Sequence, residues 1–152
     1  PYNTSYANVT WENCSLRQWM NDSFLIAAFS PEEQAQIQST SVPVDQNPET
    51  STDSDTTTDK LFLLSISEVN KYFSSDEARK CVPTAYAEAN GAYLSSSDTK
   101  NGAATCLWWL RSLGDRQAFA AGVNADGLVG DGGAYVDNEG FCVRPALWIS
   151  LE

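Results

Sequence analysis

The chain has 152 residues, of which 42% are hydrophobic, as expected for one folded domain with its own core. It carries 20 acidic residues against 9 Lys and Arg, so its formal net charge is −11. This acidity argues against nucleic acid and anionic membrane surfaces as partners, since both need basic patches, and no apolar stretch is long enough for membrane insertion.

Helix signals dominate much of the first ninety residues. Ser15 can cap a short helix, because its side chain can accept hydrogen bonds from the first N–H groups. Ser30 and Ser65 are each followed three residues later by a glutamate, which is the pattern of a capping box. The predicted helices cover residues 15–20, 30–38, 65–73, 76–80 and 84–90, with an apolar run at residues 24–29.

Residues 39–59 have almost no apolar content. We expect them to form a long exposed acidic loop within a single domain of residues 1–152, because core signals continue on both sides. Residues 61–64 predict a buried strand.

Short strand candidates fill the last third of the chain, separated by turns of Gly, Asn and Asp. They cover residues 106–112, 118–124, 128–129, 134–136 and 142–151. Helices first and strands later predict an α+β fold, with short helices in the first half and an antiparallel sheet drawn mainly from the second half.

The chain has four cysteines and no histidine. An even number of cysteines suits an oxidising compartment. We expect disulfides between Cys106 and Cys142, which open the two most strand-like segments, and between Cys14 and Cys81, which adjoin helical segments. The alternative is four free thiols, most of them buried.

Two arginines and two tryptophans lie in apolar strands. Arg111 and Arg144 must be paired if they are buried, so we interpret them as structural arginines; the alternative is that they hold an anionic ligand. Trp108 and Trp109 point to opposite faces of a strand. One belongs to the core, and the other, taken as Trp109, packs under a loop or stacks on a ligand.

Glycine-rich turns between residues 118 and 140 carry the candidate ligand-binding groups. Loops on a rigid scaffold often bind ligands, and these loops offer hydrogen-bonding and aromatic side chains. The candidates are Asn124, Asp126, Asp131, Tyr135, Asp137 and Asn138. Asp126 and Asp131 also suit calcium, although Asp-Gly equally signals a hairpin turn. Apart from calcium, we expect no cofactor.

Catalysis is not expected. Without histidine, neither a Ser-His-Asp triad nor a Cys-His pair can form. No carboxylate has the apolar sequence context that raises a catalytic pKa.

Four motifs carry a resemblance to a known family: WENCSLRQWMN (residues 11–21), DKLFLLS (59–65), WWLRS (108–112) and VRPALWI (143–149). They resemble an uncharacterised domain of secreted and surface proteins of gut-dwelling Gram-positive bacteria. That domain is similar, more distantly, to the C-type-lectin-like fold of sulfatase-modifying-factor domains. The resemblance implies a lectin-like fold and an extracellular or cell-surface location.

The chain departs from the family pattern in two respects. The family usually has more strand-like sequence before Tyr2, so we expect an N-terminal strand or hairpin to be missing. Cys14 and Cys142 stand where serine and glycine are frequent, so the resemblance implies no disulfide.

The predicted function is a bacterial surface binding or adhesion module for a glycan or a surface protein. The alternative is a structural spacer domain without a ligand of its own. Because sulfatase-modifying relatives use cysteine chemistry, a redox enzyme working through Cys106 and Cys142 is a remote second alternative. The sequence does not indicate the oligomeric state of the protein.

Overall fold

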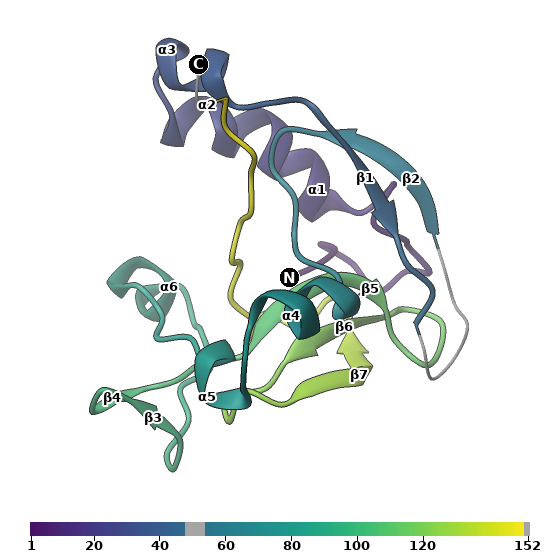
Figure 1. Cartoon of the computed structure of the whole chain (residues 1–152). Helices are drawn as coiled ribbons and strands as arrows, with labels where there is room; N and C mark the ends of the chain where they lie inside the picture. Colours follow the sequence, from purple (N-terminus) through teal and green to yellow (C-terminus); the bar gives the residue numbers. More distant parts are fainter. Residues whose placement is uncertain (48–53, 151–152) are drawn as a thin grey trace.

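Short helices and small antiparallel sheets make up this fold in a computed structural model, which describes residues 1–47 and 54–150 (Figure 1). The predicted α+β class is confirmed. The helices are α1 (Ser15–Trp19), the π-helical turn η1 (Met20–Phe24), α2 (Leu25–Ala28), α3 (Pro31–Gln36), α4 (Ile66–Tyr72), α5 (Asp76–Arg79) and α6 (Ala85–Ala89). The strands are β1 (Thr40–Val44), β2 (Ser54–Asp59), β3 (Thr99–Lys100), β4 (Ala103–Ala104), β5 (Trp108–Leu113), β6 (Phe119–Val123) and β7 (Val129–Tyr135). Among the described residues, no helix is long and apolar enough to cross a membrane.

Side-chain caps start most of the helices. Both predicted capping boxes form, with Ser30 and Ser65 each accepting a backbone hydrogen bond from the glutamate three residues later. The first helix begins differently. Its N-cap is Cys14 rather than Ser15, and the Cys14 thiol accepts from the backbone N–H of Arg17 at 3.5 Å.

Residues 39–59 are not simply the exposed loop that their composition suggests. β1 and β2 pair as an antiparallel hairpin, and its buried positions include Val42, Val44, Thr57 and Asp59. Two of those inward side chains, Thr57 and Asp59, are polar. The segment therefore lacks the alternation of apolar residues that predicts a strand. The central part of the predicted loop, residues 48–53, lies outside the described residues.

Asp59 is only 2% exposed, and three donors surround its carboxylate. Trp11 Nε1 donates at 3.1 Å, Arg17 Nε at 2.8 Å and Thr57 Oγ1 at 2.5 Å. A buried carboxylate requires such pairing, so the β1–β2 hairpin is attached to the core through a polar side chain.

The main sheet has the order β5-β6-β7, and all its pairs are antiparallel. The strand predicted at residues 142–151 is wrong as a continuous strand over residues 142–150, and residue 151 lies outside the described residues. Instead, the segment makes single bridges to three different partners: Cys142 to Trp108, Ala146 to Phe62 and Ile149 to Ile37. The segment contains Pro145, which lacks an N–H group and cannot donate to a ladder. Residues 61–64, which were predicted to form a buried strand, form a single bridge from Phe62 to Ala146 and no strand.

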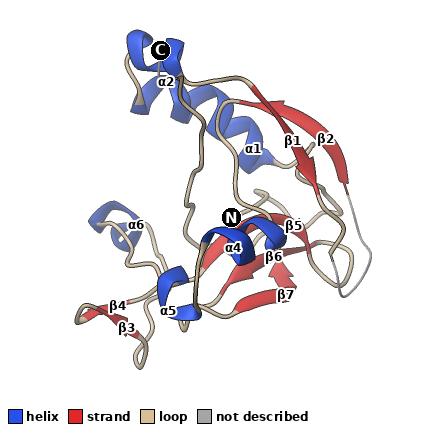
Figure 2. Cartoon of the chain, in the orientation of Figure 1, coloured by secondary structure: helices blue, strands red, loops and turns tan. Residues whose placement is uncertain are grey.

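The two faces of β5 are covered by two hydrophobic clusters, and Trp108 and Trp109 are both completely buried. Trp109 packs with side chains from α1, η1, α2 and β1, whereas Trp108 packs with those of α4 and β6. Figure 2 shows α1, α2 and the β1–β2 hairpin on one side of the three-stranded sheet. Alternation along the strand therefore sends the two tryptophans into separate clusters.

Arg111 lies on the same strand face as Trp109, and its side chain is 1% exposed. Its Nε and Nη2 donate to the carbonyl of Pro43 at 2.9 and 2.7 Å, and its Nη1 donates to the carbonyl of Leu63 at 2.7 Å. The guanidinium also forms a two-pronged ion pair with Glu68 of α4. One side chain thus joins β5, β1, the 61–64 segment and α4.

Truncation of Arg111 should strongly destabilise the protein. We expect Arg111→Ala to lower the free energy of unfolding by about 3–5 kcal/mol, because Glu68 and two carbonyls lose their buried partner. Urea denaturation measures this change. Arg116→Ala is the matched control: Arg116 pairs with Asp115 on the surface, and its removal should cost under about 1 kcal/mol. Similar losses for the two variants would contradict the role given to Arg111.

Gly122 in β6 allows the C-terminal segment to pack closely against the sheet. A Cβ atom at this position would lie 2.6 Å from Cε1 of Phe141. We expect Gly122→Ala to destabilise the fold by about 1–3 kcal/mol, measured by thermal unfolding, because the Phe141 ring must move. Gly132→Ala is the control, since the nearest side-chain atom would be 3.7 Å away. Equal effects would show that the contact with Phe141 is not decisive.

Candidate functional site

A cavity of about 630 Å³ lies between α6, the α1–η1 helix and the segment of residues 139–145. We call it the aromatic pocket. In Figure 1 the C-terminal segment, drawn in yellow, descends from the region of α2 and α3 toward β5, with α6 to its left. The volume is within the range of about 300–1,000 Å³ that is typical of small-molecule sites.

One wall of the aromatic pocket consists of Trp19 and Phe24, whose ring centroids are 4.8 Å apart. In a π-helical turn, hydrogen bonds join residues i and i+5, so positions five apart lie above one another. The turn Met20–Phe24 therefore brings the two rings to the same face of the helix. Trp19 remains 45% exposed.

The opposite wall is α6, which presents Tyr86, Ala87 and Asn90. Thr84 caps the start of this helix, and Gly91 follows its end with a φ of +90°, a conformation that favours glycine. Tyr86 is 79% exposed, the highest value among the large hydrophobic side chains that the structure describes. A ring this exposed on a short capped helix is available to contact a ligand.

The floor of the pocket is fixed to the core of the domain. The ring of Phe141 stacks on Trp109 with a centroid distance of 3.9 Å and an interplanar angle of 17°. The next residue, Cys142, is held by two backbone hydrogen bonds: its N–H donates to Leu107 at 2.8 Å, and its carbonyl accepts from Trp109 at 3.1 Å.

Few side chains of the aromatic pocket can form strong polar interactions with a ligand. The Thr84 hydroxyl caps α6, and the Asn90 amide donates to the carbonyl of Tyr86 at 2.8 Å. Glu139 is the one carboxylate among the described lining residues. The site therefore offers broad ring contacts with a small number of orienting polar groups.

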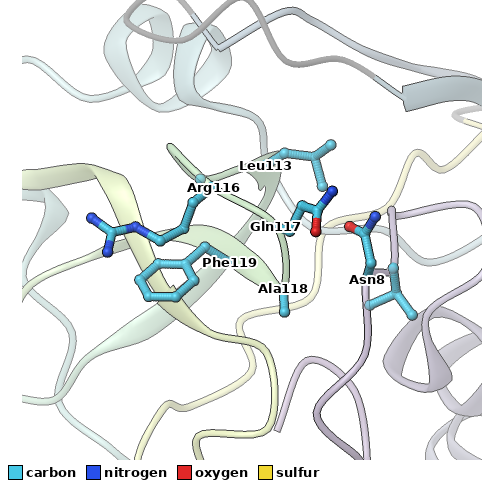
Figure 3. Close-up of a pocket in the computed structure, with 8 residues that line it drawn as sticks. Asn8, Leu113, Arg116, Gln117, Ala118 and Phe119 are labelled. Atoms are coloured by element: carbon cyan, nitrogen blue, oxygen red, sulfur yellow. The ribbon is translucent and has the colours of Figure 1, made fainter.

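A second, smaller cavity of about 300 Å³ lies between residues 8–9 and the β5–β6 turn. Figure 3 shows the amides of Asn8 and Gln117 facing each other across it, with Arg116 beside the ring of Phe119. The Arg116 guanidinium is 4.9 Å from that ring centroid, and Phe119 in turn contacts Tyr135 at 4.4 Å.

The predicted binding residues of the late turns do not line either cavity. Asp126, Asp131 and Asn138 each accept a backbone hydrogen bond from a residue one or two positions later, at 2.8–2.9 Å, and so stabilise their own turns. Asn124 is exposed and Asp137 half-buried. Tyr135 is 51% exposed and packs between Phe119 and Tyr6, beside the smaller cavity.

Trp109 does not reach the surface in this structure, because its ring is buried between Tyr2 and Phe141. The prediction that it could stack on a ligand is therefore replaced by a core role. Within residues 1–47 and 54–150, no group of three or more Cys, Asp or Glu side chains is arranged to hold a metal ion.

Within the described residues, Arg144 has aromatic partners and no carboxylate partner. Its guanidinium lies 4.9 Å from the Trp108 ring centroid and 5.0 Å from that of Phe73, which are cation–π distances. Its Nη1 atom is buried without a hydrogen-bond partner in the described part of the chain. The cation also lies close enough to Cys81 to favour the thiolate there.

All four cysteines are among the described residues, and all are free thiols. Cys106 lies beside Cys142, as predicted, but the two are not bonded. The predicted pairing of Cys14 with Cys81 does not match the structure. Cys14 packs with Tyr2 in one hydrophobic cluster and Cys81 against the other, because α1 is joined to the β5 face that carries Trp109.

The environments of the thiols differ strongly. Burial raises the pKa of Cys14 to about 11. The side-chain hydrogen bond with Cys106, together with the charges of Arg144 and Lys100, lowers the pKa of Cys81 to about 6. The interaction with Cys106 also lowers the pKa of Cys142, while the pKa of Cys106 itself is raised. Cys106 is thus the thiol that keeps its proton.

Sequence patterns did not identify the residues of the aromatic pocket. Trp19, Phe24, Tyr86 and Phe141 come from three distant segments, and no spacing connects them. The feature of the sequence that could have indicated the pocket is Tyr86, because it is an aromatic residue on a short helix that is otherwise composed of alanines and a glutamate.

Comparison with known proteins gives one match. A family described as a domain of unknown function (DUF6273) matches residues 1–151. No curated protein and no solved structure matches the chain significantly. Because the match spans nearly the whole chain, this protein belongs to the DUF6273 family.

Proposed function

We propose that this domain is a non-catalytic, glycan-binding module of a bacterial surface or secreted protein, and that the glycan occupies the aromatic pocket. The surface location and a C-type-lectin-like fold are part of the proposal, and they rest on the resemblance of the WWLRS and VRPALWI motifs. The binding role rests on the pocket itself.

The observation that carries the proposal is the set of rings around one cavity. Trp19 and Tyr86 remain largely exposed on opposite walls, while Phe141 is fixed on the floor by Trp109. Exposed rings on a rigid support can stack on the apolar face of a sugar ring and lose little conformational entropy. A cavity with aromatic walls and few polar groups is typical of a binding site.

The negative charge of the chain limits the classes of sugar that can bind. The chain carries a net charge of −11, and Glu139 lies at the pocket itself. Both disfavour acidic sugars through repulsion. We therefore expect neutral or amino sugars rather than sialylated or sulfated ones.

The pocket favours binding over hydrolysis. Glycoside hydrolases use a pair of carboxyl groups on either side of the scissile bond. Among the described residues that line the aromatic pocket, Glu139 has no second carboxylate beside it. This supports a module that holds a glycan without cleaving it.

Removing either exposed ring should weaken glycan binding. We expect Tyr86→Ala and Trp19→Ala each to weaken the affinity for a neutral or amino-sugar glycan, selected on a glycan array, by about tenfold, which corresponds to about 1.4 kcal/mol. Isothermal titration calorimetry measures the affinity. Tyr72→Ala is the matched control, because Tyr72 is also half-exposed but does not line the pocket.

Two other outcomes would overturn this assignment. If the triple variant with alanine at Tyr135, Asp126 and Asp131 loses binding while both pocket variants keep it, the ligand binds at the late turns. If no glycan on the array binds the intact domain, a spacer domain without a ligand of its own replaces the proposal.

A further inference from the structure

Three cysteines from distant parts of the chain converge at the edge of the main sheet. Cys81 follows α5, Cys106 precedes β5, and Cys142 belongs to the C-terminal segment. Cys81 and Cys106 are opposed in an antiparallel bridge, and the Cys106 N–H donates to the Cys81 carbonyl at 2.9 Å. The Cys106 thiol donates to the Cys81 carbonyl at 3.4 Å, and its side chain interacts electrostatically with those of both Cys81 and Cys142.

The backbone geometry permits a disulfide between Cys81 and Cys106. Opposed residues of an antiparallel pair have Cα atoms about 4.5–5.5 Å apart, inside the range of about 4.4–6.8 Å found for disulfides. Cys142 is hydrogen-bonded to Leu107 at 2.8 Å and bridges Trp108, so it lies on the next strand-like segment beside Cys106. Cys106 is therefore the shared neighbour of both thiols, and a Cys106–Cys142 bond requires the two backbones to approach each other.

The three thiols differ in access and charge. Cys106 is completely buried, Cys81 is partly exposed, and Cys142 lines the aromatic pocket. Arg144 and Lys100 supply positive charge near Cys81. Cationic surroundings and partial exposure are the properties of a reactive thiol, whereas buried thiols are inert toward outside reagents.

We propose that Cys81, Cys106 and Cys142 form a thiol–disulfide exchange site that accepts low-molecular-weight disulfides, with Cys81 as the attacking thiol and Cys106 as the shared resolving thiol. The proposal does not depend on the ligand of the aromatic pocket, because it concerns bonds among the chain's own sulfurs. The lowered pKa of Cys81, about 6, agrees with its role as a thiolate at neutral pH.

The reaction balances with a small disulfide RSSR as the oxidant. The Cys81 thiolate attacks one sulfur of RSSR, which forms a mixed disulfide and releases one RS⁻. The released RS⁻ takes the proton of Cys106, and the Cys106 thiolate then attacks the Cys81 sulfur, which forms the Cys81–Cys106 disulfide and releases the second RS⁻. The two thiolates take up the two protons lost by the protein, so two RSH leave for each RSSR reduced. The Cys142 thiolate can then attack Cys106, which gives Cys106–Cys142 and frees Cys81.

Disulfide mapping tests the site directly. The reduced domain is incubated with oxidised glutathione, alkylated and analysed by peptide mass spectrometry. We expect one intramolecular disulfide per chain, always including Cys106 and shared between Cys81 and Cys142, with Cys14 alkylated. Cys106→Ser should accumulate a glutathione adduct on Cys81, and Cys81→Ser should slow the first step by about tenfold or more.

Cys14→Ser is the matched control and should leave the pattern unchanged, because that thiol lies in a separate cluster. The wild-type map decides the question even if a variant fails to fold. A chain that forms no bond at Cys106 overturns the proposal, as does one that mainly joins Cys81 to Cys142 or bridges Cys14.

The pH dependence of labelling gives an independent check. The rate of iodoacetamide modification of Cys81 should rise with pH and reach half of its maximum near pH 6, because only the thiolate reacts. An unperturbed thiol reaches half of its maximal labelling rate at about pH 8.5. A midpoint near 8.5 for Cys81 would overturn its assignment as the attacking thiol.

Discussion

The guanidinium of Arg111 is the contact on which much of the fold depends. A planar group with five donors can serve several acceptors at once, and here it serves Pro43, Leu63 and Glu68. The carbonyl of Arg111 also accepts from the Tyr2 hydroxyl at 3.1 Å, which ties the N-terminal segment to the same point. Apolar side chains could fill this space, but they could not satisfy the carbonyls of two segments that lack a ladder of their own there.

The position of the aromatic pocket's floor depends on this core. Arg111 and Trp109 lie two positions apart on β5, so the residue that secures the sheet is next to the one on which Phe141 stacks. The floor is therefore rigid. The walls are short helices, and the most exposed ring is on α6, a helix of five residues. A fixed floor below exposed rings on capped helices suits a site that holds a ligand by stacking.

Local chemistry was predictable from the sequence, and long-range pairing was not. The capping boxes at Ser30 and Ser65 formed because they depend on residues three apart. The β1–β2 hairpin was missed because its inward Thr57 and Asp59 are polar, and the partners that satisfy Asp59 from outside the hairpin, Trp11 and Arg17, are 48 and 42 positions away. The segment after Cys142 resembled a strand in composition, yet its partners lie in three separate parts of the fold. The pocket combines such distant segments, so no local pattern could show it.

The positions of the cysteines bear on whether exchange among them is energetically feasible. A Cys81–Cys106 bond would close a loop of about 25 residues that contains α6, while Cys106–Cys142 would close one of about 36 that contains the main sheet. Because the loop entropy depends only logarithmically on length, these closures differ by about 0.3 kcal/mol. Loop entropy therefore favours neither bond strongly, and the local environments of the two thiols decide the balance. A Cys106–Cys142 bond would involve a residue of the pocket floor, whereas a Cys81–Cys106 bond would close the loop that carries α6, the wall of the same cavity.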